Sequence, residues 1–142
     1  MPSEDAAFED VHDFIDDYGK ALVGGDGDAI ADFWDVPALV VGKEGVIAVD
    51  DRNEVRGFFA SAAAQYRAYG ITDTDGEVIV VTRVGDRIVE VEVRWAMLDA
   101  DGNERGAERS TYTLRKDDEG QLRIRMVVSH PVEGGPPELR GH

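Results

Sequence analysis

The sequence predicts an α+β domain in which a curved antiparallel sheet packs on three N-terminal helices. Two observations carry this prediction. Before Gly70, apolar residues recur every three or four positions, as on one face of a helix, and after Gly70 they alternate with polar residues, as in strands. Three helices cover only one face of such a sheet, so we expect the sheet to curl around them and to leave a cone-shaped cavity at its open end.

The first two helices are predicted from one apolar stripe and one capping residue. Apolar residues three or four positions apart mark the first helix: Phe8, Val11, Ile15, Tyr18 and Leu22. Gly24-Gly25 ends this helix. Asp26 is a suitable N-cap for a second, short helix that closes at Pro37. This second helix is expected to carry Ile30, Phe33 and Trp34.

A hairpin and a third helix follow. Residues 38–41 and 46–49 are short apolar runs on either side of a glycine-containing turn, which predicts a small hairpin. Asp51 and Glu54 have the spacing of a capping box at the start of the third helix. The buried stripe of this helix stops before Gly70 and consists of Val55, Phe58, Phe59, Ala62, Tyr66 and Tyr69.

Four strands are predicted after Gly70, at about 71–83, 87–99, 108–116 and 122–130. Turn-forming residues connect them, which is typical of an antiparallel meander. Alternation along the fourth strand assigns its apolar face to Leu122, Ile124, Met126, Val128 and His130. Val127 and Ser129 are accordingly placed on the opposite face.

The 142 residues suit a single domain over the whole chain, with an ordered core at about 6–131 and a loose tail at 132–142. The absence of cysteine excludes disulfides, thiol catalysis and iron–sulfur clusters. No apolar run is long enough to span a bilayer, and the acidic start of the sequence does not resemble a signal peptide. We therefore expect a cytoplasmic protein with no membrane partner.

The charge balance is strongly acidic, with a formal net charge of −15. Nucleic acids and anionic membranes would be repelled by such a surface, so neither is expected as a partner. The chain has 18 Asp against 12 Glu and 3 Lys against 12 Arg, a composition similar to that of proteins from salt-in halophiles. The alternative interpretation is an ordinary acidic protein.

Tyr18 and His130 are the candidate catalytic residues. Tyr18 lies on the buried stripe of the first helix. It is either a core tyrosine with a structural role or a hydrogen-bond donor in a pocket. His130 ends the last strand on the predicted apolar face. It is either a histidine with a structural role or a general base. With His12 and His142 it shows no metal-ligand spacing, so no metal and no cofactor are expected. The candidates for the lining of a ligand pocket are Trp34, Tyr66, Trp95, Tyr112 and Met126.

The joint between the first two helices resembles the NTF2-like superfamily. Residues 18–30 read YGKALVGGDGDAI and are followed by Phe33-Trp34. Many members carry an aromatic residue, Ala-Leu, Gly-Asp and then an apolar residue at this joint. The resemblance and the order of elements imply the cystatin-like cone fold of ketosteroid isomerase, the SnoaL-like polyketide cyclases, scytalone dehydratase and limonene epoxide hydrolase. These relatives differ in activity, so the resemblance implies a fold rather than a reaction.

The residues of ketosteroid isomerase are matched only in part. The resemblance places Tyr18 at the position of the oxyanion tyrosine of that enzyme. The catalytic base would lie within residues 38–42 and the second acid within residues 110–114, but these segments read ALVVG and STYTL and contain no carboxylate. Isomerisation of the steroid type is therefore not expected, and the inward Asp-Arg-Asp set of the epoxide hydrolases is not found either.

We expect a mostly apolar pocket for a small hydrophobic organic molecule. If the protein is an enzyme, the resemblance implies proton transfer without a cofactor, as in an isomerase, dehydratase or cyclase. Tyr18 would donate a hydrogen bond to the developing oxyanion, and His130 would move the proton. The alternative is a non-catalytic ligand-binding or dimerisation module. Relatives commonly dimerise through the outer face of the sheet, so the resemblance implies a homodimer through that face.

Overall fold

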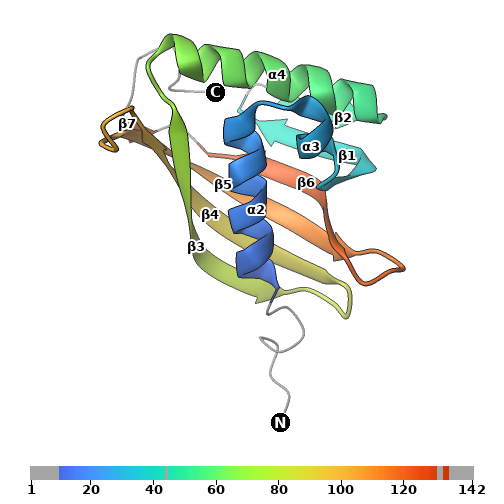
Figure 1. Cartoon of the computed structure of the whole chain (residues 1–142). Coiled ribbons are helices and arrows are strands. Elements are labelled where there is room, and N and C mark those ends of the chain that lie inside the picture. The colour runs from blue at the N-terminus through green and yellow to red at the C-terminus, as the bar shows by residue number, and fades with distance from the viewer. Residues whose placement is uncertain (1–9, 44, 131–132, 135–142) are drawn as a thin grey trace.

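The computed structural model describes residues 10–43, 45–130 and 133–134 and has the predicted α+β architecture (Figure 1). Its helices are α2 (Val11–Gly24), α3 (Gly27–Ala31) and α4 (Arg52–Ala68). Its strands are β1 (Trp34–Gly42), β2 (Gly45–Val49), β3 (Asp73–Arg83), β4 (Ile88–Leu98), β5 (Glu104–Lys116), β6 (Leu122–Ser129) and β7 (Glu133–Gly134). Helix α2 lies on the concave face of the sheet, and α4 crosses one end of it (Figure 1).

The strands form one curved sheet in the order β2-β1-β6-β5-β4-β3, and β7 pairs with β5. Strands β3 to β6 are the antiparallel meander that the sequence predicts. The hairpin of β1 and β2 joins this meander through a parallel pairing of β1 with β6. The sheet is therefore mixed rather than wholly antiparallel, because β1 runs parallel to β6. These two strands are far apart in the sequence, so no hairpin makes them antiparallel.

The third predicted helix begins with Asp51 as its N-cap and with a variant of the capping box, in which Glu54 reaches back to the residue before the N-cap. The Asp51 carboxylate accepts a hydrogen bond from the Glu54 N–H at 2.9 Å. The Glu54 carboxylate in turn accepts one from the Asp50 N–H at 2.7 Å. These bonds satisfy N–H groups that have no partner within the helix, and they fix the start of α4 where the spacing of Asp51 and Glu54 predicts it.

Helix α3 is capped as predicted but is shorter than expected. The Asp26 carboxylate accepts a hydrogen bond from the Asp28 N–H at 3.0 Å. The helix ends at Ala31, and Trp34 is already the first residue of β1. Trp34 is only 5% exposed, so it keeps its inward position although it belongs to a strand.

The hydrophobic core lies between α2, α4 and the concave face of the sheet. On α2 the predicted stripe is at most 1% exposed at three positions: Val11, Ile15 and Tyr18. These side chains belong to the same cluster as three fully buried residues of β4: Val89, Val91 and Val93. Because burying each such side chain stabilises the fold by roughly 1.5–3 kcal/mol, the stripe fixes the rotation of α2 and thereby the inward position of Tyr18.

The predicted alternation of β6 is correct in its first half and wrong in its second half. The pairing of β5 with β6 shifts register between Ile124 and Met126, so that Arg125 is an extra residue in a β-bulge. Beyond the bulge the faces are exchanged. Val127 is 7% exposed and belongs to the core cluster, whereas Met126 and Val128 lie on the opposite face.

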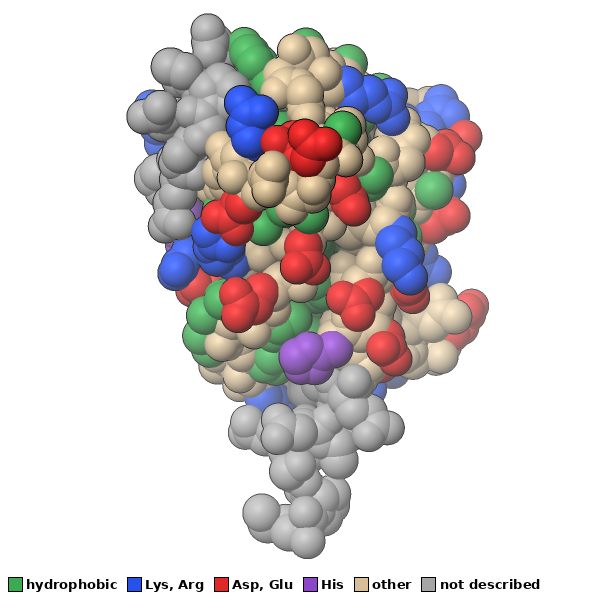
Figure 2. All heavy atoms as spheres, turned by 60° about the vertical axis from the view of Figure 1, so that its left-hand side comes forward, with side chains coloured by type: hydrophobic (Ala, Val, Ile, Leu, Met, Phe, Trp, Pro, Cys, Tyr) green, Lys and Arg blue, Asp and Glu red, His purple; other side chains and the backbone are tan. Residues whose placement is uncertain are grey.

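Part of the sequence-based prediction concerns residues outside the described ones. The loose N-terminus and most of the tail at 132–142 belong there, and within the tail Glu133–Gly134 form β7. Over the described residues, no helix is both long enough and apolar enough to cross a membrane. On the face drawn in Figure 2, carboxylates are scattered among basic and apolar side chains rather than gathered in one patch.

Candidate functional site

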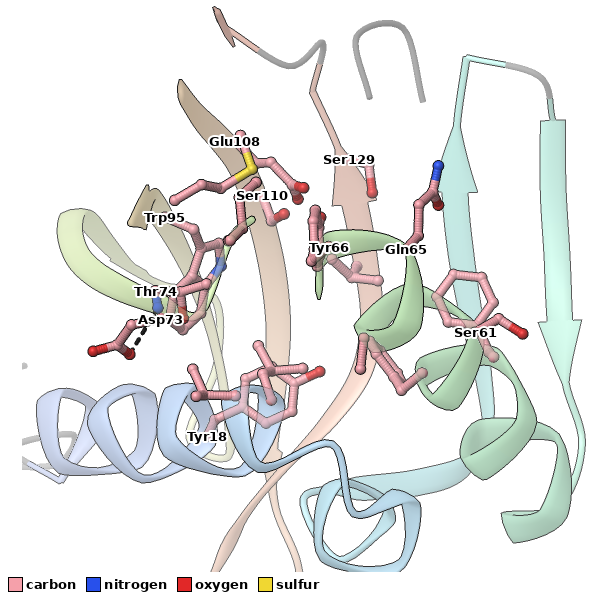
Figure 3. A pocket seen from close by; sticks show the side chains of 18 of the residues that line it. Tyr18, Ser61, Gln65, Tyr66, Asp73, Thr74, Trp95, Glu108, Ser110 and Ser129 are labelled. Carbon is pink, nitrogen blue, oxygen red and sulfur yellow. Dashed lines mark hydrogen bonds between the residues drawn. The ribbon is translucent and has the colours of Figure 1, made fainter. Parts of the chain in front are cut away.

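A cavity of about 490 Å³ lies between α2, α4 and the concave face of the sheet. Figure 3 shows side chains of α2, α4 and the long strands directed into this space. Both candidate catalytic residues and four of the five candidate lining residues contribute to the wall: Tyr18, His130, Trp34, Tyr66, Trp95 and Tyr112. The cavity therefore collects side chains that are up to 112 positions apart in the sequence, from Tyr18 to His130.

Met126 is the candidate lining residue that does not line the cavity. The bulge at Arg125 turns it to the outer face of the sheet, where its register partner on β1 is Leu39. Val127 and Ser129, which an uninterrupted alternation places outside, form this part of the wall instead.

Each of the two buried tyrosines is held by a tryptophan. The Trp34 indole N–H donates to the Tyr18 hydroxyl at 3.2 Å, and the Trp95 indole N–H donates to the Tyr112 hydroxyl at 3.0 Å. The two phenol rings are 5.9 Å apart and nearly perpendicular. Aromatic packing and two hydrogen bonds thus fix both hydroxyl groups in the cavity wall.

Burial keeps these two hydroxyl groups protonated. It raises the pKa of Tyr18 well above the ordinary value, and Tyr112 raises it further, while the hydrogen bond from Trp34 lowers it in part. Burial likewise raises the pKa of Tyr112, and the hydrogen bonds with Trp95 and Ser110 lower it in part. Both phenols are therefore neutral hydrogen-bonding groups at physiological pH.

Glu108 is a cavity residue that the sequence analysis missed. Strand β5 begins at Glu104, before the predicted start, and Glu108 shares the inward face with Ser110 and Tyr112 (Figure 3). The charge of its carboxylate raises the pKa of Tyr112, so the two groups interact electrostatically. The spacing of two residues from Ser110 is the signal that could have identified Glu108.

His130 lies at the edge of the cavity. Its backbone N–H donates to the carbonyl of Arg109 at 2.9 Å, and its ring Nε2 forms a hydrogen bond with the Thr111 hydroxyl at 3.0 Å. Thr111 alternates with Ser110 and Tyr112 on β5, so its side chain lies on the other face of the sheet. The bond to Thr111 therefore draws the imidazole toward the outer face and away from the Tyr18 hydroxyl.

The rim of the cavity carries further polar groups. Asp73 accepts a hydrogen bond from the Thr74 N–H at 2.8 Å (Figure 3). The Thr74 hydroxyl is buried and has no hydrogen-bond partner among the described residues. Arg67 directs its guanidinium toward the carbonyls of Val23 and Gly24 at 3.5 Å, at the end of α2. Within the described residues, no group of three acidic or histidine side chains could hold a metal ion.

The comparisons with known proteins give one family. The family model described as NTF2-like protein (DUF6841) matches residues 8–132. No protein of curated function matches the sequence.

Several solved structures share the fold. A Nostoc punctiforme protein of unknown function with a cystatin-like fold is 14% identical, with a TM-score of 0.74 over 92% of this chain and 94% of that chain. The protein Aln2 from a Streptomyces species is 18% identical, with a TM-score of 0.71 over 94% of both chains. A ketosteroid isomerase-like protein from Erwinia carotovora atroseptica is 15% identical, with a TM-score of 0.66 over 89% of this chain and 95% of that chain. These similarities show the fold alone, and the family match identifies the chain as a member of the NTF2-like family DUF6841.

Proposed function

We propose that this protein binds a small, neutral and mostly apolar organic molecule in the cavity between α2, α4 and the sheet. The observation that carries the proposal is the cavity itself, which leaves about 490 Å³ unfilled beside tightly packed aromatic rings. Ligand pockets typically have this size, with apolar walls and a few polar groups that orient the ligand. The proposed ligand carries no negative charge, because the wall has the carboxylates of Glu108 and Asp73, whereas the one guanidinium that the described residues bring to it, that of Arg67, already donates to backbone carbonyls at the end of α2.

The two tryptophans provide a direct test of ligand binding. They are the only tryptophans of the chain, and both line the cavity. Nitrogen–proton correlation NMR therefore gives two indole signals, and both report on this site. We expect α-tetralone, a neutral bicyclic ketone, to shift both signals in a saturable titration.

A matched pair of variants locates the binding. Ser129 lines the cavity, whereas Val128, the preceding residue, lies on the outer face. Ser129→Phe adds a ring inside the cavity and should weaken binding of α-tetralone at least tenfold, while Val128→Phe adds the same ring outside and should leave the affinity unchanged. Equal effects of the two substitutions would contradict binding in this cavity.

A second candidate function is proton transfer next to a carbonyl group. Glu108 supports it, because the Glu108 carboxylate lies in the same cavity as the hydroxyls of Tyr18 and Tyr112. The carboxylate would take a proton from the carbon beside the carbonyl, the resulting enolate oxygen would accept hydrogen bonds from the phenols, and the proton would then return to carbon. His130 is less suitable for this role, since its ring is bound to Thr111.

Exchange of the α-protons of tetralone in heavy water tests this second function. NMR should show exchange accelerated by the protein, and Glu108→Gln should reduce the acceleration by about a hundredfold or more, the usual contribution of a general base. The control is His130→Gln, which should leave the rate nearly unchanged. A loss confined to His130→Gln would assign the base to the histidine, and binding without accelerated exchange would support the non-catalytic binding module.

A further inference from the structure

Trp95 and Glu108 lie directly opposite each other on neighbouring strands. They are register partners in the pairing of β4 with β5, and both side chains line the cavity (Figure 3). Side chains at directly opposite positions of an antiparallel pair have their Cβ atoms about 4.5–5.5 Å apart. The fold therefore places a carboxylate and an indole ring side by side in one part of the cavity wall.

Aromatic rings make up much of this wall. Both tryptophans of the chain line the cavity, together with three tyrosines and two phenylalanines. An aromatic ring carries partial negative charge on its face, and tryptophan attracts cations most strongly. The attraction grows where water is excluded, and Trp95 is only 5% exposed. A positively charged group in this cavity would therefore be attracted both by a carboxylate and by aromatic rings.

The hydrogen-bonding groups of the wall suit a ligand that brings a donor. The indole N–H groups of Trp34 and Trp95 already donate to phenol oxygens, and the Arg67 guanidinium donates to carbonyls at the end of α2. An ionised carboxylate such as that of Glu108 only accepts hydrogen bonds, at about four positions. Glu108 interacts within the chain as well, and a carboxylate with this many positions accepts a hydrogen bond from a ligand at the same time.

The other charged and titratable groups around the cavity also favour positive charge. Asp73 on β3 adds a second carboxylate to the wall. The imidazole of His130, after the end of β6, is bound to Thr111 on the outer face of the sheet. The negative charge of Glu108 is also felt within the wall, since it raises the pKa of Tyr112. These surroundings stabilise a cation in the cavity, in line with the net charge of −15 on the whole chain.

We propose that Glu108 and Trp95 form a cation site in the cavity wall, and that the preferred ligand is a small organic base that is neutral when free and protonated on its nitrogen when bound. The nitrogen takes its proton from water, and the resulting N–H group donates to the Glu108 carboxylate beside the ring of Trp95. This inference rests on the proposed ligand-binding function and adds the chemical class of the ligand.

The test compares two probes of the same size and shape. Isoquinoline is a weak base with a ring nitrogen, and naphthalene has a C–H group in its place. The dissociation constants of both are measured with the indole signals at two pH values, one below and one above the pKa of free isoquinoline. The measured quantity is the dissociation constant of naphthalene divided by that of isoquinoline.

We expect this ratio to be about tenfold higher at the lower pH than at the higher pH, which corresponds to a rise of about one unit in the pKa of the bound nitrogen. Glu108→Gln removes the negative charge and should abolish most of this increase. The matched control is Glu104→Gln, on the same strand but outside the cavity, where Glu104 pairs with Arg94. The control should keep the increase to within about twofold of the wild type.

Two outcomes of this comparison overturn the inference. One is a ratio that does not change with pH in the wild type. The other is an equal increase in both variants, which would show that the acidic protein attracts cations without a specific site. The proposed function survives either outcome if α-tetralone still binds, and it fails separately if neither α-tetralone nor these probes bind.

A measurement on the wild type keeps the inference testable if a variant does not fold. The nitrogen NMR signal of isotopically labelled isoquinoline moves far upfield when the nitrogen is protonated. At a pH just above the pKa of the free base, free isoquinoline is mostly neutral, whereas the bound molecule should give a signal near that of the isoquinolinium ion. A bound signal at the position of the neutral base overturns the inference.

Discussion

The indole ring of Trp95 lies against the backbone of Gly76, its register partner on β3, where a Cβ atom would come within 2.5 Å of the ring carbon Cζ3. On the other side, a Cβ atom at Gly19 of α2 would lie 3.0 Å from the same carbon. Two glycines on different elements therefore leave the space that Trp95 occupies. The same ring donates its N–H to Tyr112, so the position of this hydroxyl depends on Gly76.

Gly76→Ala should accordingly displace Trp95. We expect a loss of unfolding free energy of about 1–3 kcal/mol, as for other overpacked interiors, and a shift of the Trp95 indole signal as its bond to Tyr112 weakens. Denaturation in urea measures the first effect, and NMR measures the second.

The control for this substitution is Gly57→Ala. Gly57 lies in α4, and a Cβ atom there would meet no neighbour within 4 Å. Alanine is the better helix former, so Gly57→Ala should stabilise the protein by about 1 kcal/mol. If Gly76→Ala and Gly57→Ala changed the free energy of unfolding by similar amounts, the contact between Gly76 and Trp95 would not be what destabilises the Gly76 variant.

The two buried phenols predict a loss of stability in alkali. Their pKa values in the folded protein lie above the ordinary value of 10.0, so the folded state holds these protons more tightly than the unfolded state does. The stabilisation is fully present below pH 10 and is lost as the pH rises toward the folded-state pKa values. Each tyrosine contributes a slope of about 1.4 kcal/mol per pH unit in that range.

Urea denaturation at a series of pH values above 10 measures this slope. Tyr18→Phe and Tyr112→Phe should each remove one tyrosine's share of it, while Tyr69→Phe, in which the replaced side chain is only partly buried, should leave the slope as it is. An equal slope in all four proteins would contradict the buried, protonated state of the two phenols.

The sequence predicts the fold well where one local signal decides the structure. Asp51 and Glu54 give the start of α4 correctly because a capping box needs only neighbouring residues. The stripe on the first helix identifies Tyr18 as inward because the period of a helix leaves no equivalent alternative.

The parts that the sequence did not reveal depend on pairing between strands. Val127 and Val128 are both apolar, so the residues of β6 fit either face, and only the register with β5 shows the bulge at Arg125. Glu108 was missed because the predicted strand began at that residue, whereas β5 extends back to Glu104. The volume of the cavity depends on how aromatic rings from five elements pack against one another. No local sequence pattern predicts this packing.

The acidic composition predicts that salt stabilises the protein. With a net charge of −15, repulsion between surface carboxylates opposes folding in dilute buffer, and added ions screen it. Surface ion pairs such as Arg52–Asp32 are also screened, but such pairs contribute little each. We expect the midpoint of thermal unfolding to rise as KCl increases from low to molar concentration.

A charge variant distinguishes this repulsion from a general effect of salt. Asp16 and Asp17 are exposed residues in the middle of α2, so replacing both with lysine makes the net charge four units less negative. The double variant should show a smaller rise in the midpoint with KCl than the wild type does. An unchanged midpoint in the wild type would contradict the halophilic interpretation of the composition.

The outer face of the sheet predicts a homodimer. Because of the bulge, Met126 and Val128 lie outside beside their β1 register partners Leu39 and Val41, and Leu39 is 40% exposed. Contiguous apolar residues on a surface are typical of an association site. On the same face, Arg109 pairs with Glu92 within the chain at 3.3 Å. The apolar group rather than cross-subunit ion pairs should therefore hold the two copies together.

Light scattering at micromolar concentration, in moderate and in molar KCl, measures this association. We expect a dimer at both salt concentrations, because burial of apolar surface, unlike attraction between exposed charges, is not weakened by screening. Met126→Lys should give a monomer, since the lysine charge would be buried in the interface. Val84→Lys, at a residue that is 57% exposed outside this apolar group, should leave the dimer intact. A wild type that is monomeric at both salt concentrations, or a Met126→Lys variant that still dimerises, would rule out this interface.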